Sequence, residues 1–310
     1  MTAIATDASV SSMPPAHRRG SKLRRRNTLI GWSFILPNFL GFALLTLIPV
    51  LALFYLGFTN WNIFGTAKWT GLANFQRLIG DTTFHTALIN TFYYALIHIP
   101  LSFVAALGLA LLLNTKIRGA AFFRTAAFFP YITSIVAIAV VWNLLFSPQY
   151  GPINEFLRFI GIANPPGWLQ SQEWAMPATA IVSTWRDMGY YMILFLAGLQ
   201  AVPRELHEAA RMDGAGVWQR FWNVTMPCLR PTTFFVTVML TINSFKVFDL
   251  ILVMTGGGPG NATLVLSQFI YNQGFEQNNF GYASAASIVL FFICLLVTIG
   301  QFLINKKRSA

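Results

Sequence analysis

Long apolar stretches, separated by short polar ones, run along most of this chain. A helix that crosses the hydrocarbon core of a membrane needs about 20 consecutive, predominantly apolar residues. Six stretches reach this length, near residues 29–56, 86–113, 121–146, 177–199, 232–255 and 282–304. Prolines inside them are expected to kink a helix rather than to end it, because neighbouring helices satisfy the freed carbonyl groups. The pattern therefore predicts an all-α integral membrane protein with six transmembrane helices over residues 29–310.

The composition supports the same class of protein. Hydrophobic residues make up 55% of the 310 residues and charged residues only 10%, with a mean hydropathy of +0.57. A soluble domain carries about 25% charged residues. The formal net charge of +11 would suit a nucleic-acid partner, but the basic residues are not arranged for one. Cys228 and Cys294 are not placed for a disulfide, and no cluster of Cys and His indicates a metal site.

Lysine and arginine residues fall mainly in alternate polar segments. Residues 1–28 form a polar tail, expected to be disordered, that ends in six basic residues. With that tail in the cytoplasm, sixteen basic residues lie on the cytoplasmic side and three outside, namely Lys68, Arg77 and Arg158. Cytoplasmic loops carry the excess of Lys and Arg in membrane proteins. Both termini are therefore predicted to be cytoplasmic, and the basic tail is assigned to topology and anionic lipid rather than to nucleic acid.

The longest polar run between two apolar stretches covers residues 203–231. A proline opens the run, and Glu205 and Glu208 follow where the first turns of a helix favour negative charge. Either Gly214 or Gly216 would supply the left-handed residue that ends this helix. The run is thus predicted to begin with a short helix and a tight turn.

A second short helix is expected over residues 217–224, ended by Pro227 and Pro231 because proline lacks the N–H that a helix interior needs. Two short helices joined by a turn would form an elbow between the fourth and fifth spans. The distribution of basic residues places this elbow on the cytoplasmic side.

The elbow carries a motif of fixed spacing: Glu-Ala-Ala, three residues, Gly, nine residues, Val224, one residue, Met226 and Pro. The motif resembles the EAA loop of ABC-importer permeases, in which Ile and Leu are usual at the positions of Val224 and Met226. The resemblance implies a coupling helix that docks into a groove on a cytoplasmic ATPase. The residues assigned to that contact are Glu208, Ala209, Ala210, Asp213, Gly214 and Pro227. An ordinary amphipathic cytoplasmic loop is the alternative, because short motifs also match by chance.

Segments outside the elbow resemble carbohydrate-type importer permeases, the class of the maltose, lactose and glycerol-phosphate systems. These segments cover 71–95, 147–161, 185–215 and 248–263, and the resemblance extends over most of the chain from Ile30 onward. It implies the translocation subunit of an ATP-binding-cassette importer for a sugar or oligosaccharide, with a permease domain over 29–310. The implied setting is a multi-pass protein of a bacterial or archaeal cytoplasmic membrane.

The same resemblance implies the partners and the cofactors. The partners would be a second permease subunit in a heterodimer, two ATPase subunits and an extracytoplasmic solute-binding protein, besides the sugar and the membrane lipid. ATP and Mg²⁺ would belong to the ATPase subunits, and no cofactor is expected in this chain. The sequence contains no G-x-x-x-x-G-K-[ST] phosphate loop. The chain is therefore predicted to be a transport subunit and not an enzyme.

Polar residues inside the predicted spans are the candidates for solute contact. Arg186 and Asp187 lie in the middle of the fourth stretch, and Asn243, Lys246 and Asp249 lie in the fifth at intervals of three residues. Residues at this interval share roughly one face of a helix. A charge at mid-membrane costs about 2.5–3.5 kcal/mol on insertion scales, so these groups are expected to face protein or a water-filled path. Lys246 would pair with Asp249 or Asp187, and such pairs either join helices or also bind a solute.

A sugar needs hydrogen-bonding groups and flat apolar faces. Asn243 offers a donor and an acceptor, and Trp185, Tyr190 and Tyr191 lie beside the charged pair. By resemblance to maltose-type permeases, Tyr191 and Asn243 match positions that contact the sugar, while Lys246 stands where those proteins use an amide. The candidate path residues are Tyr191, Asn243, Lys246, Asp249, Trp185, Arg186 and Asp187. Packing against lipid is the alternative for the aromatic residues.

Two other functions stay open from the sequence. An importer permease for a non-sugar solute such as glycerol phosphate would make use of Arg186 and Lys246. A membrane-embedded enzyme acting on lipid-linked substrates would need clustered acids, His or Cys at the membrane surface, which the sequence lacks. His85 and His98 are isolated, and a lone His is more often a structural hydrogen-bonding residue than a catalyst, because geometry comes first.

Overall fold

The structure is a computed structural model that describes residues 20–115 and 118–309. The chain forms two compact units, residues 1–52 and 53–310. Within the described residues the secondary structure is helical, apart from one isolated bridge between two loop residues. The all-α class predicted from the sequence is thereby confirmed for this part of the chain. Most of the predicted tail over residues 1–28 lies outside the described residues.

Near the N-terminus, one continuous run of helix contains a single π-helical turn. Its segments are α1 (Gly20–Phe42), η1 (Ala43–Leu47) and α2 (Ile48–Leu56). Residues Ile30–Leu56 are long and apolar enough to cross a membrane, and no residue of their most apolar window is buried.

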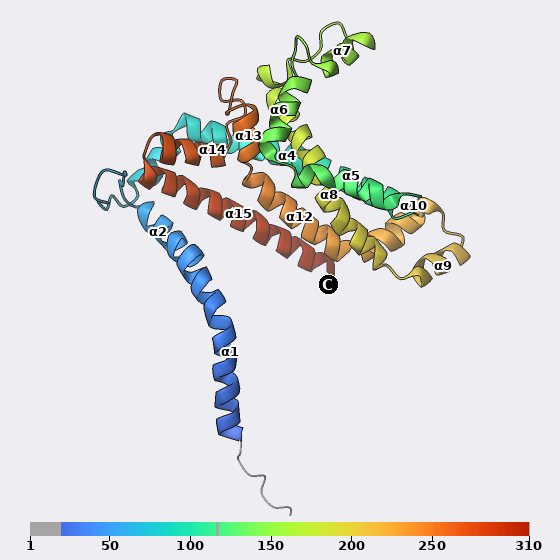
Figure 1. The fold of residues 1–310 in the computed structure, drawn as a ribbon, viewed down its shortest axis with the longest axis horizontal. Helices are drawn as coiled ribbons and strands as arrows, with labels where there is room; N and C mark the ends of the chain where they lie inside the picture. The colour runs from blue at the N-terminus through green and yellow to red at the C-terminus, as the bar shows by residue number, and fades with distance from the viewer. Residues whose placement is uncertain (1–19, 116–117, 310) are drawn as a thin grey trace, which may run out of the picture. The chain divides into compact units, whose positions relative to one another are not determined.

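The second unit holds the remaining helices. They are α3 (Ala73–Gly80), α4 (Thr82–Leu113), α5 (Ala120–Ile132), α6 (Ile135–Leu145), α7 (Pro152–Phe159), η2 (Trp168–Gln170), α8 (Ala175–Gln200), α9 (Arg204–Met212), α10 (Val217–Arg220), η3 (Phe221–Thr225), α11 (Met226–Cys228), α12 (Arg230–Phe245), α13 (Asp249–Met254), α14 (Leu266–Tyr271), η4 (Asn272–Glu276) and α15 (Phe280–Ser309). The α4 and α8 helices pack along each other and form the centre of the unit. The α5 and α12 helices pack against this pair, and α15 lies beside α12 (Figure 1).

Three described helices are long and apolar enough to cross a membrane, namely Ile30–Leu56, Thr82–Leu113 and Phe280–Lys307. The α5 and α6 helices together make a fourth candidate, bent by 98° at the break between them. Pro130 lies two residues before the end of α5, so here the chain turns sharply where the sequence predicted only a kink. By length and apolar composition, three or four segments among the described residues can therefore cross a membrane.

The fifth predicted span is not one continuous helix. The α12 helix ends at Phe245, and α13 begins at Asp249 after Phe248 takes the non-helical dihedral angles φ −147° and ψ −64°. Asn243, Lys246 and Asp249 therefore do not share one face of a helix, and that expectation is wrong. No Gly or Pro stands at the break, so no local signal in the sequence marks it. Asp249 opens α13, where the helix N-terminus favours a carboxylate.

A network around Asp81 fixes the start of α4. Its carboxylate accepts hydrogen bonds from the backbone N–H groups of Thr83 and Phe84 and from the hydroxyl of Tyr282, which lies 2.7 Å away on α15. The Arg77 guanidinium lies 4.2 Å from the centre of the Tyr282 ring. Asp81 thus caps α4 and also joins it to Tyr282 of α15, which lies 201 residues further along the chain.

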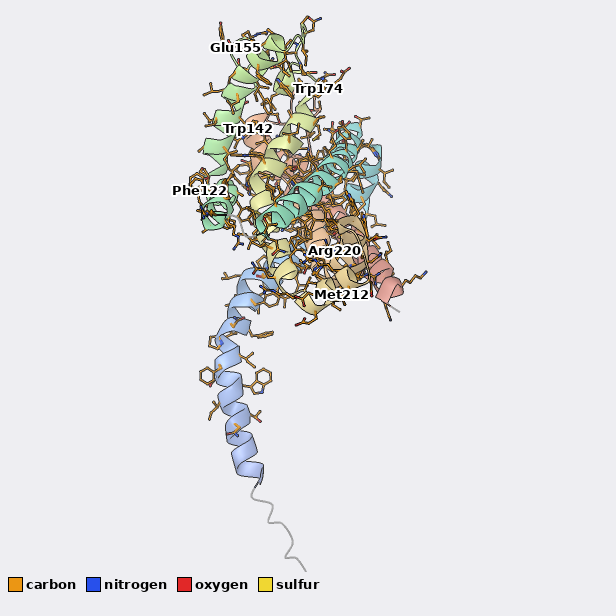
Figure 2. All side chains as sticks on the ribbon, turned by 90° about the vertical axis from the view of Figure 1, so that its right-hand side faces the viewer. Phe122, Trp142, Glu155, Trp174, Met212 and Arg220 are labelled. Atoms are coloured by element: carbon orange, nitrogen blue, oxygen red, sulfur yellow. The ribbon has the colours of Figure 1, made fainter. Side chains whose placement is uncertain are left out.

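The loops that flank α8 lie at opposite ends of the second unit. Glu155 of α7 and Trp174, just before α8, lie at one end, and Met212 of α9 and Arg220 of α10 lie at the other (Figure 2). The length of α8 therefore separates the α7 loop from the predicted elbow.

Candidate functional site

A polar cavity of about 270 Å³ lies among α4, α5 and α8 and the segment where α12 breaks. Its lining residues are Tyr94, His98, Tyr131, Ser183, Arg186, Asp187, Tyr191, Asn243, Lys246, Val247, Phe248, Asp249 and Leu250. Most of these side chains form hydrogen bonds or carry a charge, although the helices around them are apolar. The cavity could hold water or a small polar solute.

Six of the seven candidate path residues line this cavity: Tyr191, Asn243, Lys246, Asp249, Arg186 and Asp187. The seventh, Trp185, does not line it. The Trp185 ring packs edge-on against Trp142 of α6, with 5.5 Å between the ring centres. Trp185 therefore belongs to the apolar contact between α6 and α8.

Tyr191 and Asn243 join α8 to α12 across the cavity. The Asn243 Nδ2 group donates a hydrogen bond to the Tyr191 hydroxyl at 2.9 Å, and the Tyr191 side chain is buried. Tyr190 lies next to this pair, and its ring stacks on Tyr131 of α5 at 4.7 Å. The two positions that matched the maltose-type permeases are thus in direct contact with each other.

The charged residues pair differently from the sequence expectation. Asp187 lies 3.5 Å from Arg186 Nε and 3.5 Å from His98 Nε2. Lys246, which was expected to pair with Asp249 or Asp187, has no carboxylate within 4.0 Å among the described residues. The expected pairs are therefore absent, because the break after α12 places Lys246 and Asp249 on different segments.

Four further lining residues with polar side chains were not selected as candidates: Tyr94, His98, Tyr131 and Ser183. His98 Nδ1 lies 2.9 Å from the Ser244 hydroxyl, and its ring stacks on Tyr94, so His98 makes one hydrogen bond between α4 and α12. A usable signal was present in the sequence. Thr91, Tyr94, His98 and Ser102 recur at intervals of three or four residues along an otherwise apolar stretch, and all four are buried on α4.

The elbow begins as the sequence predicted. The α9 helix starts directly after Pro203, and Gly214 has the left-handed φ of +78°. The N–H of Ala215 bonds to the carbonyl of Ala210, and the N–H of Gly214 bonds to that of Arg211, which is the hydrogen-bond pattern of a Schellman motif. Gly214, and not Gly216, is therefore the residue that ends α9.

The second half of the elbow corrects the sequence prediction. Helical structure does not stop at Pro227 or Pro231 but continues through α10, η3 and α11 into α12. Each proline occupies one of the first two positions of a new helical segment, where its missing N–H costs nothing. The π-helical turn over Phe221–Thr225 shifts the hydrogen-bond register just before Pro227.

The predicted coupling residues lie on an exposed part of the elbow. Glu208, Ala209, Asp213 and Gly214 are exposed, and Ala210 is half-buried. Apolar side chains are also exposed around them, namely Leu206, Met212, Val217, Trp218 and Trp222. The exposed fraction is 89% for Met212 and 73% for Trp218. Pro227 lines a second cavity of about 650 Å³ between the start of α12 and the end of α15.

In the described part of the chain, no three His, Cys, Asp or Glu side chains are close enough together to hold a metal ion. Cys228 and Cys294 are both free thiols.

Comparison with known proteins gives the family. Residues 99–310 match the family model described as binding-protein-dependent transport system inner membrane component. The chain belongs to this family. It is 36% identical to the lactose transport system permease LacF of Rhizobium radiobacter, over 93% of the chain and 98% of that relative. It is 32% identical to the trehalose/maltose permease MalF of Thermococcus litoralis, over 93% of the chain and 97% of that relative.

The fold of this permease agrees with a solved structure of the same kind. A chain of a bacterial ABC transporter that imports the acidic polysaccharide alginate aligns with a TM-score of 0.81 at 24% identity, covering 93% of the permease and 99% of that chain. The resemblance to carbohydrate-type importer permeases that the sequence indicated is confirmed. The permease is an integral membrane transport subunit of a binding-protein-dependent importer, and not an enzyme.

Proposed function

We propose that this permease carries a sugar or oligosaccharide across the membrane and that the polar cavity lies on the path. The observation that carries the proposal is the set of hydrogen-bonding and charged groups enclosed by otherwise apolar helices. Such groups are costly in a membrane unless they face protein, water or a transported solute. Tyr191 and Asn243 offer hydroxyl and amide groups that suit a sugar, and the aromatic ring of Tyr131 lines the same cavity. Known sugar permeases among the relatives support the same class of solute.

The proposed topology has six spans with both termini in the cytoplasm. The spans correspond to the apolar stretches at 29–56, 86–113, 121–146, 177–199, 232–255 and 282–304. In this topology, the α5–α6 pair and the α12–α13 pair are two spans with broken helices. Non-helical backbone is tolerated at membrane depth where it lines a cavity, as the segment from Lys246 to Phe248 does here. Residues 1–28 would be a cytoplasmic tail.

The proposed assembly is a heterodimer with a second permease subunit, two ATPase subunits that bind ATP and Mg²⁺, and an extracytoplasmic solute-binding protein. The exposed elbow supports an ATPase partner, because its charged and apolar side chains have no cover within the described chain. Glu208 would be the charged contact, Ala209 and Ala210 would let α9 seat closely, and Asp213 and Gly214 would shape its end. The setting is a bacterial or archaeal cytoplasmic membrane.

The proposed mechanism is alternating access. Closure of the ATPases on ATP would move both coupling helices and switch the paired permeases from inward-facing to outward-facing. A ligand drives such a switch only when it binds one state better than the other. ATP and the loaded binding protein would both favour the outward-facing state, so hydrolysis and solute delivery would be coupled.

Uptake by the reconstituted importer tests the path assignment. Asn243→Leu removes hydrogen bonds worth about 0.5–1.5 kcal/mol each while keeping a similar side-chain size. We expect lower uptake of ¹⁴C-labelled maltose, lactose or trehalose, whichever the wild type takes up, with the ATPase still co-purifying at the wild-type level. Normal uptake by Asn243→Leu would place the path elsewhere.

A matched pair of variants tests the coupling assignment. Glu208→Ala should weaken ATPase docking, because truncating one member of a buried charge pair costs about 2–5 kcal/mol. Glu205→Ala changes the same residue type on the same exposed helix, one turn earlier, and should leave docking unchanged. Binding-protein-stimulated ATP hydrolysis is measured for both. Equal, wild-type hydrolysis would make Glu208 an ordinary surface residue.

A phosphorylated solute such as glycerol phosphate is the second candidate. The observation in its favour is that two cations, Arg186 and Lys246, line the cavity. Uptake of ¹⁴C-labelled glycerol 3-phosphate by the wild type, without uptake of the sugars, would select it.

A further inference from the structure

The hydrogen bonds around His98 determine which ring nitrogen carries the proton. His98 is 1% exposed, and its Nδ1 lies 2.9 Å from the Ser244 hydroxyl oxygen. That hydroxyl donates its own hydrogen bond to the carbonyl oxygen of Leu240 at 2.7 Å. A serine hydroxyl has a single proton to donate. Ser244 therefore accepts from His98, so in the neutral imidazole the single ring proton lies on Nδ1.

This tautomer leaves Nε2 of His98 as an acceptor. A neutral imidazole has one donor nitrogen and one acceptor nitrogen. The buried Nε2 atom has no hydrogen-bond partner among the described residues, and it lies 3.5 Å from Asp187 Oδ2. The second Asp187 oxygen, Oδ1, is likewise buried without a hydrogen-bond partner. Two unpartnered acceptors, His98 Nε2 and Asp187 Oδ1, thus belong to residues that line the cavity, and each needs a donor.

The charges around the cavity decide which donor fits. Arg186 and Lys246 contribute two positive charges and Asp187 and Asp249 two negative ones, so the lining has no net charge when His98 is neutral. Arg186 Nε lies 3.5 Å from Asp187 Oδ1 and offsets part of its charge. Two hydroxyl groups, one for each acceptor, donate these hydrogen bonds without adding charge. A phosphate ester would instead bring negative oxygens against two acceptors.

We infer that His98 Nε2 and the Asp187 carboxylate receive hydroxyl groups of the transported solute, so that the site takes an uncharged polyhydroxylated molecule rather than a phosphate ester. This inference rests on the proposed function, in which the cavity lies on the translocation path. Ser244 acts as a positioning residue, because it holds the imidazole in the tautomer that accepts at Nε2.

The tautomer is tested by ¹⁵N NMR on the assembled importer, with histidine labelled in this chain. The chain has four histidines, and His98→Gln identifies the signal of His98 by its disappearance. We expect a neutral ring protonated at Nδ1 in the wild type. Ser244→Ala should move the proton to Nε2, because the ring then has only Asp187 to donate to. A wild-type ring protonated at Nε2, or at both nitrogens, would overturn the inference.

The acceptor role is tested by uptake into proteoliposomes with ¹⁴C-labelled maltose, lactose, trehalose and glycerol 3-phosphate as probes. His98→Leu should lower uptake of the sugar that the wild type transports by about tenfold, as expected for a lost buried hydrogen bond. His98→Gln should retain more uptake, because its amide oxygen again offers an acceptor. Ser102→Ala is the matched control: it breaks a buried hydrogen bond of 3.1 Å between α4 and α8, away from the cavity, and should change uptake less than twofold.

The two proposals fail in different ways. If Asn243→Leu lowers sugar uptake but His98→Leu does not, the cavity stays on the path and the acceptor role is refuted. If both variants transport the sugar normally, the path assignment fails as well. Uptake of glycerol 3-phosphate alone refutes the uncharged solute.

Discussion

The contact between α5 and α8 depends on a glycine. Gly189 is buried on α8, and a Cβ atom added there would overlap the carbonyl oxygen of Ala127 on α5 and lie 2.8 Å from Phe128 Cα. Both neighbours are backbone atoms, so no side-chain rotation relieves the overlap. Gly189→Ala can therefore be accommodated only if the two helices separate.

The expected magnitude follows from two opposing effects. Alanine in place of glycine inside a helix stabilises by about 0.5–1 kcal/mol. Overpacking of a tight contact costs about 1–3 kcal/mol and occasionally more, and a clash between backbone groups belongs at the upper end. Gly108→Ala is a matched control, because Gly108 lies inside α4 with no atom within 4 Å of an added Cβ. The difference between the two variants isolates the packing cost, about 1–3 kcal/mol.

Thermal unfolding of the purified importer measures this difference. We expect Gly189→Ala to unfold at a lower temperature than the wild type, and Gly108→Ala at the same or a higher temperature. Separation of α5 from α8 should also weaken the Tyr131–Tyr190 stack and lower uptake. If Gly189→Ala is as stable as Gly108→Ala, the close crossing of α5 and α8 is wrong.

Two further predictions concern the ends of helices. Gly214→Ala should destabilise the end of α9 by about 1 kcal/mol, because φ is +78° there, and should therefore speed amide hydrogen exchange in α9. Gly216→Ala is the control, because φ is −67° there, and it should leave the exchange unchanged. Equal exchange in the two variants would refute the role of Gly214. Burial opposes the charged form of Asp81, but hydrogen bonds from Tyr282 and two backbone N–H groups outweigh it and hold its pKa below the ordinary 3.8. A carboxylate whose pKa is lower in the folded state stabilises the fold at neutral pH, and this stabilisation is lost as the pH falls through the folded pKa. The free energy of unfolding of Asp81→Asn should therefore fall less between neutral pH and about pH 4 or below than that of the wild type. The same loss in both proteins would refute this.

The elbow could be predicted because its signals are local. A proline that opens a helix and a glycine that closes it act through their own dihedral angles, and both appear where the sequence placed them. The choice between Gly214 and Gly216 could not be made from the sequence, because both residues tolerate a positive φ. The sequence also did not predict that helix continues past Pro227. A proline ends a helix where the helix needs a backbone N–H at that position, because proline has none. The π-helical turn before Pro227 changes which backbone N–H groups are needed.

The breaks in the membrane helices could not be predicted in the same way. The α12 helix ends at Phe245 with no Gly or Pro nearby, so tertiary contacts and not local propensity decide its end. The 98° bend after α5 follows Pro130, but a proline in a span is compatible with either a kink or a break. His98 and Ser183 were not selected, because only the packing of α4 against α8 brings them to the same cavity as Arg186 and Asp187.

Six of the seven candidate path residues share one cavity although the geometric reason given for three of them was wrong. Their shared place follows from the free-energy cost of a polar group in an apolar environment. An amide or a charge within an apolar stretch must contact other polar groups, with or without a break in the helix. The expectation that failed rests on an unbroken helix between Asn243 and Asp249. The break itself turns Lys246 and Asp249 toward the cavity from two different segments, so the costly groups meet without the helical face that was assumed. Trp185 differs from the other six because its large ring is mainly apolar and carries no charge. It therefore packs against Trp142 and does not line the cavity.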